Sequence, residues 1–132
     1  MNHCLLSLGS NDAPEASLEQ ARTLLTHRFP SLRWGAAKQT EPIGMPPGTP
    51  WFVNQVGALY TSLSSIEVRL ILKEMEKLIG QTPEGKAKGL IRIDIDLLCY
   101  NGTVLKEKEY NYPCIRSLIN KLLEEEKASD RS

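Results

Sequence analysis

The chain has 132 residues, of which 41% are hydrophobic and 24% charged, a composition typical of one folded domain and not of a disordered chain. Sixteen Lys and Arg residues balance sixteen Asp and Glu residues, and this zero net charge argues against a protein that binds nucleic acid through a broad basic surface. No apolar run approaches the roughly 20 residues of a membrane span, and the start lacks a secretory pattern. We therefore expect one cytoplasmic domain over residues 1–132, with a solvated tail over residues 124–132.

The first third of the chain predicts a strand, a helix and a second strand. Cys4–Leu8 has the apolar character of a short buried strand. Asp12 stands where a helix N-cap is expected, with Glu15 three residues later in a capping-box pattern, and apolar residues recur at helical spacing as far as Phe29. We expect residues 32–38 to form a half-exposed strand.

The next segment, Thr40–Pro50, contains four prolines and two glycines. Proline is excluded from helix interiors and central strands, so this segment predicts a surface loop. The loop is long for a simple connection, which favours a binding role. Gly44 and Gly48 leave places for it to bend, as in a lid that closes over a bound substrate.

The middle of the chain predicts a strand, a helix and a polar loop. Trp51–Tyr60 is strand-like. Ser64 and Glu67 match a capping box, and Gly80 is a natural end for the helix. Gln81–Gly89 follows as the loop. The apolar stripe of the helix comprises Val68, Ile71, Leu72, Met75, Leu78 and Ile79.

The last third predicts a strand, a hairpin and a short helix. Leu90–Tyr100 is the most strand-like stretch of the chain, and Asn101-Gly102 is a type I′ hairpin signal that leads into Thr103–Leu105. A short final helix is expected after Pro113. Its apolar side comprises Leu118, Ile119, Leu122 and Leu123.

The predicted order of elements is strand-helix-strand, twice, with hairpins between and after the two units. This order is the split βαβ pattern. It predicts an α+β fold, namely a ferredoxin-like sandwich with a mostly antiparallel sheet and helices packed on it.

The cysteines Cys4, Cys99 and Cys114 are widely spaced, and no Cys-x-x-Cys pair is present. The two histidines, His3 and His27, are far along the chain from Cys99 and Cys114, so a zinc site is not expected. The odd number of cysteines also argues against a disulfide framework. Reduced thiols are the expectation.

Within Leu90–Leu98, apolar and polar residues alternate strictly from Ile91 to Leu97. On a strand, this alternation puts Arg92, Asp94 and Asp96 on one face. The Cα atoms of the two aspartates would be roughly 6–7 Å apart, so their carboxylates repel unless a cation lies between them. Two interpretations stay open. One is a solvated polar face that Arg92 screens, and the other is a site for Mg²⁺, which prefers one or two carboxylates together with substrate phosphates.

Five short motifs stand in order along residues 4–113. They are Leu8-Gly9-Ser10-Asn11, Thr40-Glu41-Pro42-Ile43-Gly44, Pro50-Trp51-Phe52-Val53-Asn54, Met75-Glu76-Lys77-Leu78-Ile79-Gly80 and Ile93-Asp94-Ile95-Asp96-Leu97-Leu98. With them the chain resembles the 6-hydroxymethyl-7,8-dihydropterin pyrophosphokinases of the folate pathway, which move the terminal diphosphate of ATP onto a pterin alcohol. Each motif alone is weak, whereas five in register are specific.

The resemblance implies ATP as co-substrate and two Mg²⁺ ions held by Asp94 and Asp96, which with Arg92 would form the catalytic set. It implies that Phe52 stacks on the pterin and that Asn54 bonds to the edge of the ring. The pterin-binding set would be Thr40, Pro42, Ile43, Phe52 and Asn54, and the nucleotide-binding set Glu76, Lys88, Arg92 and Leu97. We expect small-molecule substrates, no nucleic-acid or membrane partner, and a monomer or weak homodimer.

The chain departs from the family pattern where the family carries cations. The family has Pro-Arg-Thr before its aspartates, whereas this chain has Leu90-Ile91-Arg92, and Gln81-Thr82-Pro83 carries none of the arginines expected after the helix. Cys114 stands in place of a histidine, Asn120 stands in place of a later arginine, and the usual C-terminal extension is missing or reduced to a helix. The chain is therefore expected to be a divergent, C-terminally shortened member, in which Lys86, Lys88, Arg92 and Arg116 are the candidate substitutes for the missing cations.

Arg92 is the most informative departure, because a regular strand would place it on the face of the aspartates. There it would either pair with Asp94, in competition with Mg²⁺, or contact a phosphate of ATP. We expect the phosphate contact, since Gln81–Pro83 leaves the triphosphate short of cations.

Three functions remain open from the sequence. The first is pterin pyrophosphokinase activity, reduced or altered by the missing cations. The second is a non-catalytic descendant that binds a pterin-like or nucleotide ligand, or a protein partner. The third is another nucleotidyl- or phosphoryl-transfer enzyme on the same kind of sheet, which a pair of aspartates alone does not exclude.

Overall fold

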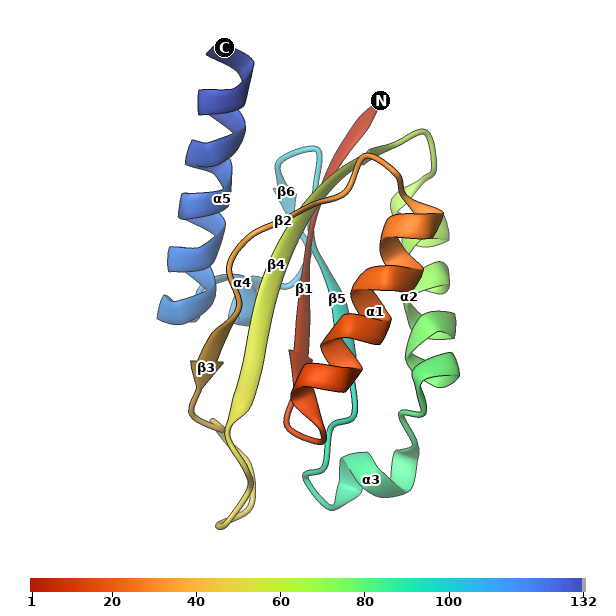
Figure 1. The fold of residues 1–132 in the computed structure, drawn as a ribbon, viewed down its shortest axis with the longest axis vertical. Helices are drawn as coiled ribbons and strands as arrows, with labels where there is room; N and C mark the ends of the chain where they lie inside the picture. The colour runs from red at the N-terminus through yellow and green to blue at the C-terminus, as the bar shows by residue number, and fades with distance from the viewer. Residues whose placement is uncertain (132) are drawn as a thin grey trace.

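The computed structural model describes residues 1–131, with side chains described through residue 129. It has a central sheet with two helices on one face and one long helix on the other (Figure 1). In chain order the elements are β1 (Asn2–Ser10), α1 (Pro14–Arg28), β2 (Arg33–Trp34), β3 (Lys38–Thr40), β4 (Phe52–Thr61), α2 (Ser65–Ile79), α3 (Pro83–Ala87), β5 (Asp94–Tyr100), β6 (Thr103–Val104), α4 (Glu107–Tyr110) and α5 (Pro113–Arg131).

The sheet has six strands in the order β2-β4-β1-β5-β6, with β3 also paired to β4. Every pairing is antiparallel. The central strand β1 pairs with β4 along one side and with β5 along the other. This α+β arrangement confirms the ferredoxin-like fold predicted from the order of elements.

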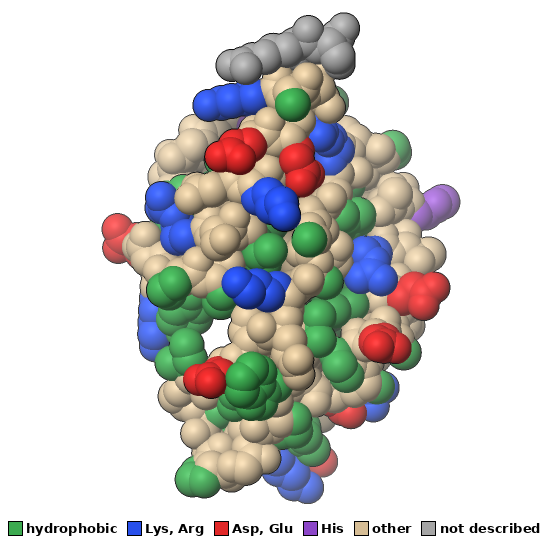
Figure 2. All heavy atoms as spheres, turned by 60° about the vertical axis from the view of Figure 1, so that its left-hand side comes forward, with side chains coloured by type: hydrophobic (Ala, Val, Ile, Leu, Met, Phe, Trp, Pro, Cys, Tyr) green, Lys and Arg blue, Asp and Glu red, His purple; other side chains and the backbone are tan. Residues whose placement is uncertain are grey.

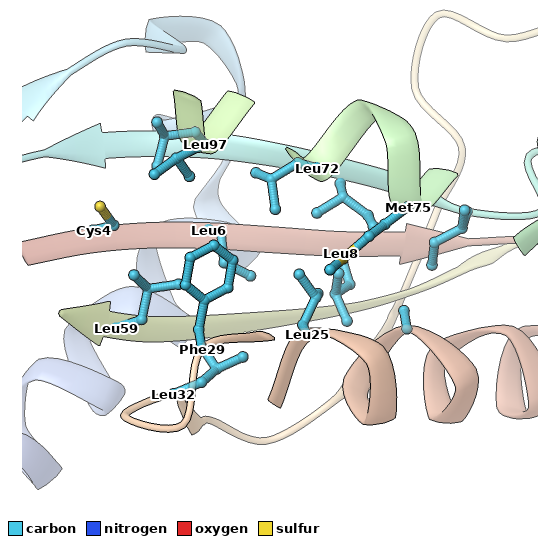
Figure 3. Packing of buried hydrophobic residues seen from close by; sticks show 14 of the residues in the cluster. Cys4, Leu6, Leu8, Leu25, Phe29, Leu32, Leu59, Leu72, Met75 and Leu97 are labelled. Carbon is cyan, nitrogen blue, oxygen red and sulfur yellow. The ribbon is translucent and has the colours of Figure 1, made fainter. Parts of the chain in front are cut away.

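Alternation along the strands separates two hydrophobic clusters. Leu6 and Leu8 of β1 face α1 and α2, where they pack with Leu25, Leu72 and Met75 (Figure 3). The opposite face of the same sheet packs against α5, and its cluster comprises Leu5, Val56, Ala58, Leu98, Cys99, Ile115, Leu118, Ile119 and Leu122. A single sheet is thus covered on both faces, although not to the same extent.

Helix α2 begins and ends as the sequence predicts. The Ser64 hydroxyl accepts a hydrogen bond from the Glu67 amide, and the Glu67 carboxylate accepts one from the Ser64 amide. Gly80 ends the helix with φ 108°, a left-handed conformation that favours glycine. The predicted apolar stripe is wrong at Leu78, whose side chain is 71% exposed.

Several predicted boundaries differ from the structure. Ala13 and not Asp12 is the N-cap of α1, because Pro14 occupies the first turn and disfavours a right-handed helical conformation in the residue before it. The predicted strand over 32–38 is divided into β2 and β3. Five residues on this side, from Trp34 to Lys38, lie opposite four on β4, from Gly57 to Asn54, and the extra residue indicates a bulge.

The second half of the chain is also more helical than predicted. The Gln81–Gly89 loop contains α3, where the Thr82 hydroxyl accepts a hydrogen bond from the Gly85 amide. Strand β5 begins at Asp94 and not at Leu90. Helix α5 continues to Arg131, so the predicted tail is helical through residue 131.

Candidate active site

Helix α5 leaves half of one sheet face uncovered, and the candidate site lies there. The helix begins at Pro113 and runs along the half of the sheet that carries Leu5, Val56 and Leu98 (Figure 1). On the other half, the residues of the same face are small or polar, apart from the aromatic Phe52. These residues are Ser7, Gly9, Phe52, Asn54, Asp94 and Asp96.

A pocket of about 550 Å³ occupies this uncovered area. Its wall is completed by the loop after β3 and by the start of α5, and a hollow bordered by hydrophobic and acidic side chains is visible on this side of the molecule (Figure 2). The lining residues are Ser7, Gly9, Gln39, Thr40, Glu41, Ile43, Met45, Trp51, Phe52, Asn54, Asp94, Asp96, Glu109, Tyr112, Pro113, Cys114 and Ile115.

Strand pairing fixes one side of the pocket, where Asn54 is the central residue. Asn54 lies opposite Gly9 of β1 and opposite Lys38 of β3 in the sheet register. Its amide donates a hydrogen bond to the Thr40 hydroxyl. A Cβ on Gly9 would lie 2.8 Å from Asn54 Oδ1, so only glycine leaves the amide in this position. Phe52, two residues before Asn54, lines the same wall.

The two aspartates form the opposite side of the pocket. Asp94 lies opposite Gly9 in the register, and Asp96 lies opposite Ser7. The side chain of Asp96 is 13% exposed. Burial, the charge of Asp94 and a hydrogen bond with Asp94 raise the pKa of Asp96 from its ordinary 3.8 to about 6, although the charges of Lys73 and Lys106 act in the opposite direction. Two carboxyl groups therefore share a narrow site, and a bound cation would relieve their repulsion.

The sequence of most of this domain matches a known family. The family described as 7,8-dihydro-6-hydroxymethylpterin-pyrophosphokinase (HPPK) matches residues 5–125, which include all residues that line the pocket and most of the sheet. The chain belongs to the HPPK family. HPPK enzymes are ATP-dependent pyrophosphokinases of folate biosynthesis, and membership gives this chain pterin pyrophosphokinase activity. No curated protein sequence matches the chain.

The carboxylates of the pocket fit magnesium bound together with a nucleotide. Among the described residues, no group of three or more His, Cys, Asp or Glu side chains could hold a metal ion without further ligands. Asp94 and Asp96 supply two carboxylates, and Mg²⁺ commonly takes its other ligands from water and substrate phosphates.

In the part of the chain that the structure describes, no helix has the length and apolar character needed to cross a membrane.

Lys73 reaches the aspartates from the other face of the sheet, and the sequence did not single it out. β6 pairs with Cys99 and Tyr100 in the described residues, which leaves the Asp94–Leu97 part of β5 at the sheet edge. At this edge Lys73 Nζ lies 3.0 Å from Glu76 Oε2 and 3.8 Å from Asp96 Oδ1. Burial, the largest influence, lowers the pKa of Lys73, but its hydrogen bond with Glu76 and the charges of Glu76, Asp96 and Asp94 outweigh burial and raise it. Lys73 is therefore a cation at neutral pH.

Several residues of the predicted sets lie outside the pocket. Arg92 precedes the start of β5, and its Nε lies 3.2 Å from Asp12 Oδ2. Arg92 thus pairs with Asp12 and not with Asp94, the alternative that the sequence left open, because the strand has not begun at Arg92. The expected contact of Arg92 with a phosphate stays a prediction. Lys88 ends α3 and is exposed, and Pro42 is not among the lining residues although its neighbours Glu41 and Ile43 are.

Glu76 and Leu97 lie on the α2 side of the sheet. Glu76 is buried, and its Oε2 accepts a hydrogen bond from the Ile95 amide at 2.7 Å. Its carboxylate thus accepts a hydrogen bond from a backbone amide at the edge of β5 and also orients the Lys73 ammonium group. Leu97 is 2% exposed and belongs to the core. A nucleotide could reach Leu97 through its backbone and not through its side chain.

Asn11 joins three segments next to the pocket. Its Nδ2 donates to the Gly89 carbonyl at 2.8 Å and to the Pro50 carbonyl at 3.4 Å, and its Oδ1 accepts from the Ile91 amide at 2.6 Å. Asn11 is 6% exposed. A buried amide with these three partners explains why Asn follows Gly-Ser at the end of β1, a position that the sequence marked as a motif without a role.

Proposed function

We propose that this pocket binds the pterin between Phe52 and Asn54 on one side and Asp94 and Asp96 on the other. The supporting observation is that these four residues, from β4 and β5, line one pocket with Thr40 and Ile43. A flat heteroaromatic ring needs an apolar face to stack on and an amide to bond its polar edge, and Phe52 and Asn54 provide these groups. The exposed side chains of Ile43 and Trp51 extend the apolar wall. Ile43 was expected at the pterin site from the sequence, whereas Trp51 was not.

Asp94 and Asp96 would hold two Mg²⁺ ions together with the phosphates of ATP. Bound magnesium would neutralise phosphate charge and make the attacked phosphorus more electrophilic. The protein then orients the pterin hydroxyl toward the β-phosphorus of ATP. The hydroxyl oxygen forms a bond to the β-phosphorus, the bond from that phosphorus to the bridging oxygen breaks, AMP leaves with the bridging oxygen, and the hydroxyl proton passes to water.

The division of the pocket is tested by two separate binding measurements. Asn54→Ala should weaken binding of the pterin, and Asp94→Asn or Asp96→Asn should abolish the Mg²⁺ dependence of binding of a non-hydrolysable ATP analogue. Each variant should leave binding of the other substrate within about twofold. Unchanged metal dependence in both aspartate variants would contradict the proposed magnesium site.

The proposed function also bears on the cellular location and the oligomeric state of the protein. Three free cysteines and the use of ATP support a cytoplasmic location. The pocket is complete within one chain, which supports a monomer or at most a weak homodimer.

A further inference from the structure

The pocket carries negative charge without a positive side chain among its described lining residues. Glu41, Asp94, Asp96 and Glu109 line it, and no Lys or Arg does. Two Mg²⁺ ions would balance these four carboxylates and leave the charge of ATP itself uncompensated. A site for a polyanion therefore needs cations from outside the pocket.

A second, smaller recess at the edge of β5 contains such cations. It is lined by Arg69, Leu72, Lys73, Ile95, Asp96, Leu97 and Lys106. Asp96 lines both the recess and the main pocket, so the two spaces meet at this aspartate. The recess is basic and the pocket is acidic, and one strand separates them.

Lys73 is positioned by Glu76 at the boundary between the recess and the pocket. The buried Glu76 carboxylate, fixed by the Ile95 amide, lies 3.0 Å from Lys73 Nζ. The side chain of Lys73 is nevertheless 50% exposed, so its ammonium group can turn toward a ligand without leaving Glu76. Arg69 lies one turn before Lys73 on α2, and Lys106 lies at the N-cap of α4.

We propose that Arg69, Lys73 and Lys106 supply the positive charge that holds the nucleotide, from the edge of β5 and not from the pocket. This inference rests on the proposed function, which places the transferred diphosphate between the aspartates and the pterin. The α-phosphate, which stays with AMP, then lies at the edge of β5, within reach of these three side chains. The three side chains take over the role that the sequence suggested for Lys88 and Arg92, neither of which lines the pocket or the recess.

The experiment compares Lys73→Met with Lys77→Met, a change of an exposed lysine one turn further along the same helix. Binding of AMP without metal, and of a non-hydrolysable ATP analogue with Mg²⁺, is measured by calorimetry at low and high salt. Lys73→Met should weaken both ligands about tenfold or more and reduce the salt dependence of binding, because a charge-assisted contact is lost. Lys73→Arg should retain most of the affinity, and pterin binding should be unchanged in every variant.

The outcomes separate this inference from the proposed function. Affinities for AMP and the ATP analogue within twofold of the unmodified protein in Lys73→Met would overturn the inference, as would an equal loss in Lys77→Met. If Asp94→Asn abolishes metal-dependent binding while Lys73→Met has no effect, the proposed function stands and the inference fails. If the unmodified protein binds neither pterin nor nucleotide, both fail.

Discussion

At the scale of single residues, the space beside Gly9 decides where Asn54 can lie. An alanine Cβ at position 9 would lie 2.8 Å from Asn54 Oδ1, closer than atoms of this kind can pack, and 3.9 Å from Phe52 Cδ1. The Asn54 amide must therefore move away from Thr40, with which it shares a hydrogen bond. The position of Asn54 in the pocket therefore requires that residue 9 has no side chain.

Gly9→Ala should accordingly weaken pterin binding about tenfold or more and leave binding of the ATP analogue within twofold. Because Gly9 acts through Asn54, adding Gly9→Ala to Asn54→Ala should cause little further loss. A double-mutant cycle of pterin affinities measures this. Fully additive losses, or a Gly9→Ala variant with normal affinity, would contradict the role given to Gly9.

The raised pKa of Asp96 makes the stability of the metal-free protein depend on pH. The folded protein holds a proton on Asp96 up to about pH 6, whereas the unfolded chain releases it near pH 3.8, so the free energy of unfolding contributed by this group falls as pH rises through that interval. Asp96→Asn removes the effect and should be more stable than the unmodified protein at pH 7, by about 1–3 kcal/mol.

Denaturant unfolding of both proteins between pH 3.5 and about 7.5, without Mg²⁺, tests this expectation. The advantage of Asp96→Asn should vanish below about pH 4, where the carboxyl is protonated in both states. Glu19→Gln, a change of an exposed acid on α1, serves as the control. A stability difference that stays constant with pH would show that the raised pKa of Asp96, caused mainly by burial, does not explain it.

At the scale of elements, the loop over 41–51 is joined to the segment that leads into β5. Asn11 bonds to Pro50 at the end of the loop and to Gly89 and Ile91 in that segment. Gly89 also packs against Thr49 and Pro46, where a Cβ would lie 3.2 Å from the Thr49 hydroxyl. The loop over 41–51 and the segment before the aspartates are thus held by one buried amide.

Asn11→Ala should destabilise the fold by about 1–3 kcal/mol, because it leaves the Gly89 carbonyl and the Ile91 amide buried without their partners. Hydrogen exchange should accelerate at Gly44, Met45 and Ile91, whereas Asn120→Ala, at an exposed asparagine of α5, should change neither stability nor these amides. In the unmodified protein, pterin together with an ATP analogue should slow exchange at Gly44 and Met45. Normal exchange in Asn11→Ala would exclude the proposed link between the two segments.

Elements with local signals were predicted well from the sequence. The capping box at Ser64, the left-handed Gly80 and the hairpin turn, where Asn101 and Gly102 have φ 50° and 82°, each depend on residues a few positions apart. The start of β5 was not predictable in this way. Arg92 lies before the strand and pairs with Asp12. Because the two residues are far apart in the sequence, no local propensity encodes their contact.

At the scale of the whole molecule, the extent of α5 determines where the pocket opens. The sequence predicted its apolar side, and Leu118, Ile119 and Leu122 are buried as expected. It did not predict that the helix would cover one half of a sheet face and leave the other half to Asp94, Asp96 and Asn54.

The cations around the site show the same dependence on tertiary structure. Lys73 could have been noticed, because it lies one turn before Glu76 on α2 and shares its side of the helix. That this side faces the edge of β5, within 3.8 Å of Asp96, follows only from the packing of α2 on the sheet. Local pattern predicted the aspartates, and packing brought the lysine to them.

The most direct test of the account is the formation of AMP from ATP, Mg²⁺ and 6-hydroxymethyl-7,8-dihydropterin. The account predicts AMP release that requires both the pterin and Mg²⁺, that is lost in Asp94→Asn and in Asp96→Asn, and that persists in the control Lys77→Met. Pterin binding without any AMP release by the unmodified protein, or AMP release that survives both aspartate changes, would contradict it.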